Sequence, residues 1–280
     1  MFWQNGQLYS AQTLTLDIDN PGWLYGATVF TTLRIYDRTL QHPLTNWNGH
    51  CDRLRHSITH FGWQQPNWDS IRQGAQSLLA HYPILRITVF PDGGEVITGR
   101  SLPIDLDRRQ RDGICAWLAD EPQFQRTLPA HKTGNYLSAW LALQMARRMN
   151  AEEAILVDRQ GYWLETSTGN LWGWQQGCWW TPPLAGDSLE EGILPGLMRS
   201  QLMDYLQQCN LPVIQQPWTA EVIGDFEAIA YTNSAIEIVP IHTVQCTPSP
   251  TPAQSRHYDP HHPQLAQLRN GWHNLGNGNP

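Results

Sequence analysis

The chain has 280 residues, 41% of them hydrophobic, and a formal net charge of −7 at pH 7. This apolar content suits one large or two moderate domains with a real core, and the negative charge disfavours nucleic acid or an anionic membrane as the main partner. The five cysteines lack disulfide or metal-site spacing, and no apolar run approaches the ~20 residues that span a bilayer. The start, MFWQNGQLYSAQ, also lacks the features of a signal peptide, so we expect a cytoplasmic protein.

Residues 1–119 predict an N-terminal domain that mixes helices and strands. Strands are expected where β-branched and aromatic residues gather, and helices where apolar residues recur at helical spacing, as Leu54 and Ile58 do. In chain order we expect a hairpin around Asn5-Gly6, strands at 28–36 and 40–44, a helix with Asn48 as its N-cap, a helix at 67–82, and strands at 84–90 and 114–119.

The second half predicts another α/β domain, over residues 130–245, after a polar, proline-bearing linker at 120–129. Its expected elements are a helix at 138–149, strands at 153–158, 162–167, 170–174 and 178–183, a helix at 195–208, and strands at 213–218, 228–233 and 236–241. Residues 246–280 predict a tail of low regularity. Its HYDPHHP run suits a solvated tail better than a weak metal site, and we expect no metal.

The stretch AHKTGNYLSAW contains Lys132, the only lysine of the chain. Arginine keeps its proton in proteins, whereas a desolvated lysine can lose it and attack a carbonyl group. A single lysine just before a predicted helix is therefore a candidate for covalent catalysis. The alternative interpretation is a surface lysine near a helix end in a chain that favours arginine.

Four motifs, in order, resemble one family. They are YGATVFTTLR, HCDRLRHS, the lysine stretch, and ETSTGNLW with its downstream ILPGLMR, and the resemblance spans about residues 22–243. The chain resembles the fold-type IV enzymes that use pyridoxal phosphate, which include branched-chain aminotransferases, D-amino-acid aminotransferases and aminodeoxychorismate lyases. The resemblance implies an α/β (α+β) fold of two domains, a smaller N-terminal α/β domain and a larger C-terminal pseudo-barrel that binds the cofactor. It also implies a homodimer and a small-molecule amino substrate.

The resemblance also assigns roles to residues of this chain. It implies that Lys132 bonds to the aldehyde of the cofactor and that Glu165 keeps the ring nitrogen protonated. The implied phosphate contacts are Arg53, the amides of Leu197 and Met198 at a helix start, and the Ser234 hydroxyl, with Tyr136 near the phenolic oxygen. The weakest assignments are the substrate contacts Phe30, Thr32, Arg34 and Arg86. The ordinary alternatives are that Arg53 is an exposed helical arginine and that Ser234 is a turn serine. Either Arg34 or Arg86 could equally form a surface ion pair.

The motifs favour a lyase over an aminotransferase. K-T-G-N-Y is one residue shorter than the K-A-G-G-N-Y of branched-chain enzymes, F-T-T-L-R replaces their F-E-G-I-R, and a methionine stands in G-L-M-R. Against this, Y-G-A-T-V-F and L-P-G look as much like branched-chain enzymes, and T-N-S-A-I-E-I-V-P-I combines the lyase asparagine with the aminotransferase glutamate. We predict an aminodeoxychorismate lyase of folate biosynthesis, which forms 4-aminobenzoate and pyruvate. The alternative is a class IV aminotransferase that acts on branched-chain or D-amino acids.

Two further classes are disfavoured. A binding protein that had lost catalysis would be expected to lack Lys132 or Glu165, and both are present. A hydrolase would need a nucleophile elbow, which is missing, and HSITH places His56 and His60 one helical turn apart without a third metal ligand nearby.

Overall fold

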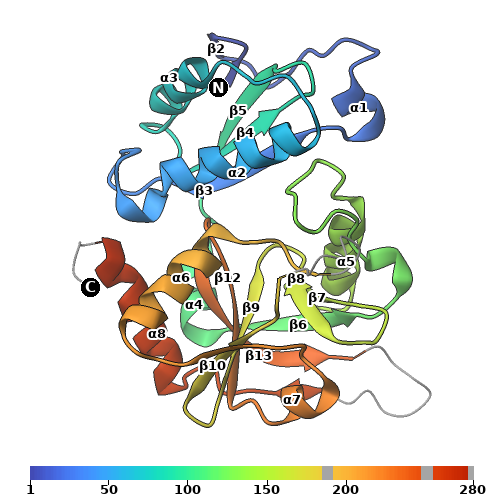
Figure 1. Cartoon of the computed structure of the whole chain (residues 1–280), viewed down its shortest axis with the longest axis vertical. Helices are drawn as coiled ribbons and strands as arrows, with labels where there is room; N and C mark the ends of the chain where they lie inside the picture. Colours follow the sequence, from blue (N-terminus) through green and yellow to red (C-terminus); the bar gives the residue numbers. More distant parts are fainter. Residues whose placement is uncertain (185–191, 247–254, 277–280) are drawn as a thin grey trace. The chain divides into compact units, whose positions relative to one another are not determined.

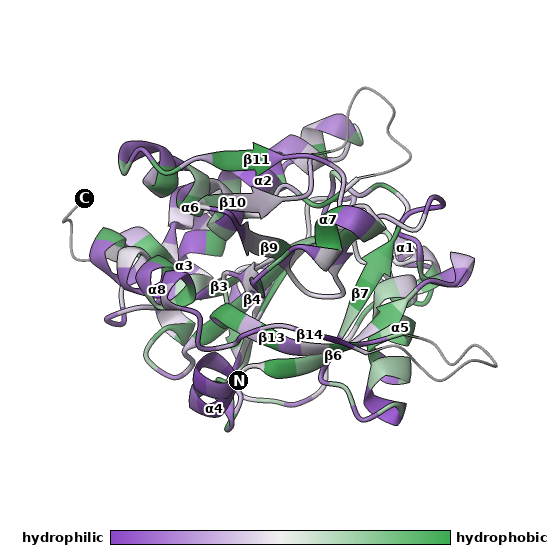
Figure 2. Ribbon diagram, turned by 90° about the horizontal axis from the view of Figure 1, so that it is seen from below, coloured by the Kyte–Doolittle hydropathy of each residue, from purple (hydrophilic) through white to green (hydrophobic). Residues whose placement is uncertain are grey.

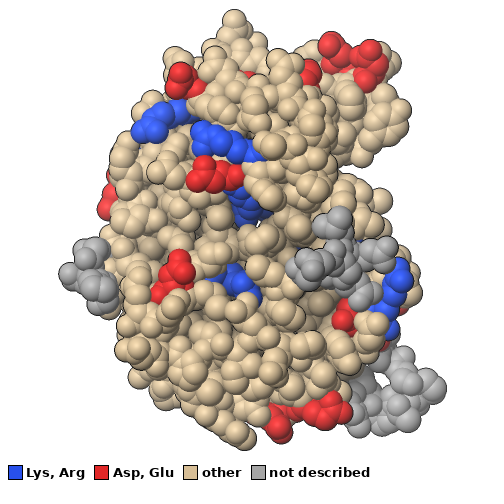
Figure 3. Space-filling view, in the orientation of Figure 1, with Lys and Arg blue, Asp and Glu red and all other residues tan. Residues whose placement is uncertain are grey.

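The computed structural model describes residues 1–184, 192–246 and 255–276, which form two compact units. The first contains Met1–Pro103 and His131–Tyr136, and the second contains Ile104–Ala130 and Leu137 to the C-terminus (Figure 1). Within the described ranges, no helix is both long and apolar enough to cross a membrane. Figure 3 shows that lysine and arginine side chains form separate small patches on the face in view, with no continuous basic band.

The first unit is a five-stranded antiparallel sheet with two helices packed on one face. The strand order is β2-β1-β5-β4-β3, with β1 at Phe2–Gln4, β2 at Gln7–Tyr9, β3 at Val29–Arg34, β4 at Ile84–Val89 and β5 at Glu95–Arg100. Helices α2 (Trp47–His60) and α3 (Trp68–Leu78) bury Leu54, Ile58 and Ile71 against the sheet residues Leu33, Ile87 and Ile97. A short helix, α1, covers Pro21–Tyr25.

The opposite face of this sheet carries several of the predicted substrate contacts. Side chains alternate between the two faces of a strand, so Phe30, Thr32 and Arg34 lie on the face opposite the one that carries Val29 and Leu33. Thr32 of β3 pairs with Arg86 of the neighbouring strand β4. The sheet therefore brings three predicted residues of β3 and one of β4 onto one face.

Two local predictions for the first unit were wrong. Helix α2 begins at Trp47, and the side chain of the preceding residue, Asn46, accepts a hydrogen bond from the Gly49 amide at 3.2 Å, so Asn46 and not Asn48 is the N-cap. Residues 40–44 form no regular strand, because Pro43 starts a 3₁₀ turn, η1, at Pro43–Thr45. The sequence reasoning also missed β5 and α1.

The second unit is built on a sheet that closes on itself. The order is β11-β10-β9-β12-β13-β6-β7-β8, and β8 also pairs with β9, so six strands from β9 to β8 form a closed ring. The bounds are β6 Ile114–Ala119, β7 Glu153–Val157, β8 Trp163–Thr166, β9 Asn170–Gln175, β10 Cys178–Thr181, β11 Val213–Gln215, β12 Ala228–Asn233 and β13 Glu237–Gln245. Closing the ring removes free edges, and the closing pair is Glu165 with Asn170.

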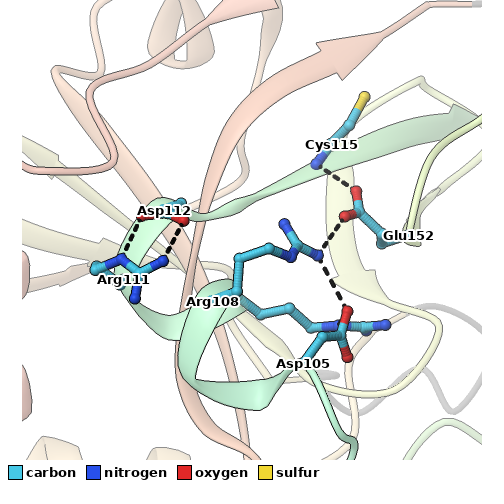
Figure 4. A network of polar contacts seen from close by, with 7 residues as sticks. Asp105, Arg108, Arg111, Asp112, Cys115 and Glu152 are labelled. Atoms are coloured by element: carbon cyan, nitrogen blue, oxygen red, sulfur yellow. Dashed lines mark hydrogen bonds and ion pairs between the residues drawn. The ribbon is translucent and has the colours of Figure 1, made fainter.

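Helices and apolar strands complete this unit. The helices are α4 (Leu106–Asp112), α5 (Leu137–Arg148), α6 (Leu197–Gln208), α7 (Ala220–Gly224) and α8 (Pro263–Gly276). Figure 2 shows β6 and β7 as largely apolar ribbons, in agreement with their burial. Polar contacts tie α4 to β6: Arg108 bonds both Asp105 and Glu152, and Glu152 accepts from the Cys115 amide at 2.9 Å (Figure 4).

The boundary between the two units differs from the one expected at residue 119. The first unit ends at Pro103 and takes up residues 131–136 as well. Strand β6 pairs in parallel with β13 and β7, which places residues 104–119 in the second unit. Residues 131–136, expected to open the C-terminal domain, lie in the first unit. The predicted linker contains a 3₁₀ turn, η2, at Pro122–Phe124, and Phe124 packs edge-on against Trp117.

The tail is more regular than expected. Its described part holds β14 (Arg256–His257), which pairs with β13, and the helix α8. Leu265, Leu268 and Trp272 of α8 are buried, so an apolar face anchors the helix to the second unit. The remainder of the predicted tail, 247–254 and 277–280, lies outside the described residues.

Candidate active site

The segment that carries Lys132 lies along β3. The Phe30 amide donates to the Lys132 carbonyl at 2.9 Å, and the Gly134 amide donates to the Thr28 carbonyl at 2.6 Å. A β-bridge also joins Val29 with Thr133. Backbone bonds on both sides of Lys132 thus fix its main chain to the strand that carries Phe30 and Thr32.

Two aromatic rings lie near the amine of Lys132. Its Nζ lies 4.9 Å from the ring centre of Phe30 and 5.3 Å from that of Tyr136, and these two rings meet edge to face at 5.7 Å. The Arg86 guanidinium carbon lies 3.6 Å from the Phe30 ring centre. Burial, and after it the charge of Arg100, lowers the pKa of Arg86 to about 10. The structure therefore brings four of the predicted residues together in the first unit.

Arg53 is a buried cation of the first unit with one hydrogen-bond donor left over. It projects from α2, and burial lowers the pKa of its guanidinium to about 10, against a smaller opposing effect of Tyr136. Its Nη2 donates to Thr31 Oγ1 at 2.6 Å, while its buried Nε has no hydrogen-bond partner among the described residues. An unsatisfied buried donor is costly, so this orphaned N–H fits an oxygen of a bound phosphate.

Glu165 lies in the second unit, on β8, and is only 4% exposed. Its Oε2 accepts from the Leu194 amide at 3.1 Å and from Asn170 Nδ2 at 3.4 Å, and Oε1 pairs with Arg126. A carboxylate offers about four lone-pair positions. Oε1 thus retains one acceptor position, which fits the protonated nitrogen of a pyridine ring.

Arg126 was missed by the sequence reasoning, which treated its segment as a linker. Its side chain is 9% exposed, and it meets Glu165 in an ion pair. A cavity of about 490 Å³ in the second unit borders the pair, with Leu128, Leu156, Asp158 and Leu164 among the lining residues. The only available signal was an arginine in an otherwise uncharged run, QFQRTLPA, close to the lysine.

The start of α6 offers backbone amides. Gly196 is the N-cap in an extended conformation and no side chain caps the helix; its first turn has no acidic residue. A Cβ at Gly196 would lie 1.9 Å from Asn170 Oδ1, so only glycine allows the helix to approach Asn170 this closely. Leu197 and Met198 open the helix, and Met198 is buried, which leaves its amide and not its side chain for phosphate contact.

Two further predicted residues are Ser234, in the second unit, and Arg34, in the first. Ser234 occupies the turn between β12 and β13, where Asn233 Oδ1 accepts the Ala235 and Ile236 amides at 2.9 and 3.1 Å. Arg34 is near the end of β3, and its guanidinium carbon lies 5.0 Å from the ring centre of Tyr36.

Comparisons with known proteins show which family the chain resembles in sequence. The family model for amino-transferase class IV matches residues 28–244. The chain is 24% identical over 270 residues to a branched-chain-amino-acid aminotransferase of Salmonella typhimurium, covering 86% of this chain and 84% of that protein. It is 26% identical over 257 residues to a D-alanine aminotransferase of Listeria monocytogenes, covering 85% of each.

Solved structures show the same fold. A branched-chain aminotransferase from Thermoproteus uzoniensis, crystallised with norvaline, superposes with a TM-score of 0.79 at 20% identity, over 99% of this chain and 94% of that chain. The pyridoxal-phosphate-bound form of a hypothetical aminotransferase from Mycobacterium tuberculosis gives a TM-score of 0.78 at 20% identity, over 98% of each chain.

The chain belongs to the class IV aminotransferase family. Members of this family are pyridoxal phosphate enzymes, and the cofactor of this chain is accordingly pyridoxal phosphate. The predicted fold class is confirmed by the structure and by the structural neighbours.

Proposed function

We propose that the protein is an aminotransferase that acts on branched-chain or D-amino acids. The observation that carries the proposal is the chain's only lysine, fixed by its backbone to β3 with its amine between Phe30 and Tyr136. The relatives that cover most of the chain are a branched-chain and a D-alanine aminotransferase, which supports transamination. This choice replaces the predicted lyase as the first candidate.

The residues of the chain have distinct roles in this proposal. Bound pyridoxal phosphate supplies an aldehyde for an amine and a ring that accepts electrons. Lys132 Nζ attaches to the cofactor and, when released, moves the proton at the substrate carbon that bears nitrogen. Glu165 keeps the proton on the ring nitrogen, and Arg126 balances its buried charge.

In this proposal, a buried arginine and the backbone amides at a helix start bind the phosphate. Arg53 supplies a guanidinium with a buried, unpartnered Nε, and the amides of Leu197 and Met198 lie where the helix dipole favours an anion. Ser234 adds a hydroxyl in this proposal. Phe30 and Tyr136 shield one part of the half-buried amine from water, which favours proton transfer by Lys132 over exchange with solvent.

The substrate contacts are proposed for one sheet face. Thr32 and Arg86 face each other across β3 and β4, and Arg86 is a partly buried cation that suits a substrate carboxylate. The threonine pair Thr31-Thr32 is also the observation that favours the lyase as a second candidate, because F-T-T-L-R resembles lyases.

One experiment separates the two reactions. Protein loaded with pyridoxal phosphate is supplied in parallel with leucine plus 2-oxoglutarate, with D-alanine plus 2-oxoglutarate, and with aminodeoxychorismate alone. The aminotransferase requires the keto acid and forms glutamate. A lyase forms pyruvate and 4-aminobenzoate over many turnovers without a keto acid. Faster turnover of aminodeoxychorismate than of either amino acid would reject our first choice, and Lys132→Arg serves as the inactive control.

We also infer a homodimer, as the family resemblance implies. Helix α1 exposes Trp23, Leu24 and Tyr25 at 70%, 49% and 75% of their surface, an apolar area that a second copy would cover. Light scattering should then give twice the chain mass of 32.0 kDa, and a monomer at micromolar concentration would contradict the inference.

A further inference from the structure

A buried three-residue relay joins β3 to α2. Thr31 Oγ1 lies 2.6 Å from Arg53 Nη2 and 2.6 Å from His50 Nδ1. Thr31 is 0% exposed and His50 1%. Both residues lie on the helix-covered side of the sheet, among core side chains. A polar group buried there destabilises the fold unless it is hydrogen-bonded.

The donors and acceptors are compatible with a neutral His50. A guanidinium only donates, so Thr31 Oγ1 accepts from Arg53. When the imidazole carries its proton on Nε2, the Thr31 hydroxyl donates to His50 Nδ1; in the other tautomer it accepts from Nδ1 through its second lone pair. The pKa of His50 is well below its ordinary value because of burial, and secondarily because of the charges of Arg53 and Lys132. The relay is thus satisfied at neutral pH.

The relay fixes one edge of the Arg53 guanidinium and leaves another available. Nη2 is held by Thr31, whereas the buried Nε has no partner among the residues that the structure describes. Rotation of the fork toward another acceptor would break the Thr31 bond. The hydroxyl therefore holds the guanidinium in the orientation that leaves Nε without a partner among the described residues.

The same strand also holds the lysine. Thr31 follows Phe30, whose amide donates to the Lys132 carbonyl at 2.9 Å. One residue of β3 thus bonds the lysine segment, and the next bonds the phosphate-binding arginine. This arrangement sets the spacing between the amine and the guanidinium through two neighbouring residues of a strand.

We propose that Thr31 and His50 are positioning residues that hold the Arg53 guanidinium for the phosphate of the cofactor. The inference rests on the proposed role of Arg53 in phosphate binding. Neither residue touches the reacting atoms. Their contribution should therefore appear as selectivity for a phosphorylated ligand and not as a loss of all binding.

The test compares two ligands that differ only in the phosphate. Dissociation constants of apoprotein for pyridoxal phosphate and for pyridoxal are measured by absorbance titration and equilibrium dialysis, without any turnover. Both ligands carry the aldehyde that Lys132 needs, so their ratio isolates the phosphate. Arg53→Ala gives the full loss of selectivity, against which each relay variant is compared.

Matched variants separate the hydroxyl from the shape of the side chain. We expect Thr31→Val to reduce the selectivity about 10-fold, the effect of a lost buried partner of a charged group, and Thr31→Ser to retain it. His50→Leu should also reduce the selectivity, whereas His50→Asn keeps an acceptor and retains most of it. Thr45→Val is the control, because Thr45 is equally buried in the same unit but its hydroxyl bonds to the Tyr36 amide and the Thr39 carbonyl.

The outcomes distinguish the two levels of the proposal. Unchanged selectivity in Arg53→Ala would reject the proposed phosphate role itself. Loss of selectivity in Arg53→Ala together with normal selectivity in both Thr31→Val and His50→Leu would overturn the relay alone. Equal weakening of both ligands in Thr31→Val would reveal a purely structural role and would also overturn it. If Thr31→Val does not fold, the pair His50→Leu and His50→Asn decides.

Discussion

Glu165 and Arg126 form a buried ion pair in the second unit, 39 residues apart in the chain. The two side chains are 5% and 9% exposed, so bulk solvent reaches little of either charge. Glu165 also accepts two further hydrogen bonds at its other oxygen. Arg126 therefore balances and orients the carboxylate that we assign to the cofactor's ring nitrogen.

Removing Arg126 should destabilise the protein more than removing an exposed partner. Arg126→Met leaves the buried carboxylate without its counter-charge, and we expect a loss of about 3–5 kcal/mol in the free energy of unfolding. Urea denaturation of apoprotein measures it. Arg111→Met is the matched control, because its pair with Asp112 is 67% and 44% exposed and its removal should cause no measurable change. Equal effects of the two variants would contradict the buried pair's role.

Glu165→Gln should separate cofactor binding from turnover. The amide keeps the shape but lacks the charge that holds the ring nitrogen protonated. We expect pyridoxal phosphate to bind and kcat to fall roughly 10²-fold or more, as for removal of an electrostatic stabiliser. Steady-state kinetics with a titration of the cofactor measure both quantities. A fully active variant would show that another residue pairs with the nitrogen.

Lys132 should be the sole site of covalent attachment. Because the chain has one lysine, borohydride reduction of the loaded protein should label a single tryptic peptide, and the unreduced protein should absorb in the near ultraviolet or visible range. Lys132→Arg keeps the charge but not the reactive amine. We expect that variant to fold, as judged by circular dichroism, and to take up no label. Mass spectrometry that finds the label at Met1 or elsewhere would rule out the assignment.

Two buried histidines should make the protein less stable in mild acid. Burial lowers the pKa of His131, with smaller effects of His60 and His56, and the pKa of His50 is also well below the ordinary 6.5. The unfolded chain therefore binds more protons than the folded one below about pH 6.5, so the free energy of unfolding should fall as pH decreases, by at most about 1.4 kcal/mol per pH unit for each group.

Urea denaturation of apoprotein between about pH 8 and pH 5.5 measures this slope, above the range in which ordinary carboxylates titrate. His131→Asn should flatten it, because the ring packed against His56 and His60 at 5.6 and 4.4 Å is removed. The exposed His81 supplies the control variant, His81→Asn. A slope that does not change in His131→Asn or in His50→Asn would show that other groups cause it.

The sequence by itself determined the local elements and the chemistry. Periodicity predicted α2, α3, α5 and α6 and most strands, because local spacing sets which face of a helix or strand is apolar. The single lysine and four ordered motifs indicated the family and the cofactor. They did not resolve the reaction, since the lyase and the aminotransferase share these motifs, and the relatives favour the second.

Only the tertiary structure decided the pairings between distant residues. Six apolar residues at 114–119 predict a strand, but their place beside β13 depends on partners more than a hundred residues away. The same holds for Lys132 on β3, for Thr31 and His50 beside Arg53, and for Arg126 with Glu165. A threonine in an apolar strand and an arginine in a loop have many local interpretations. Burial against a particular partner selects one, because an unpaired buried polar group is too costly to keep.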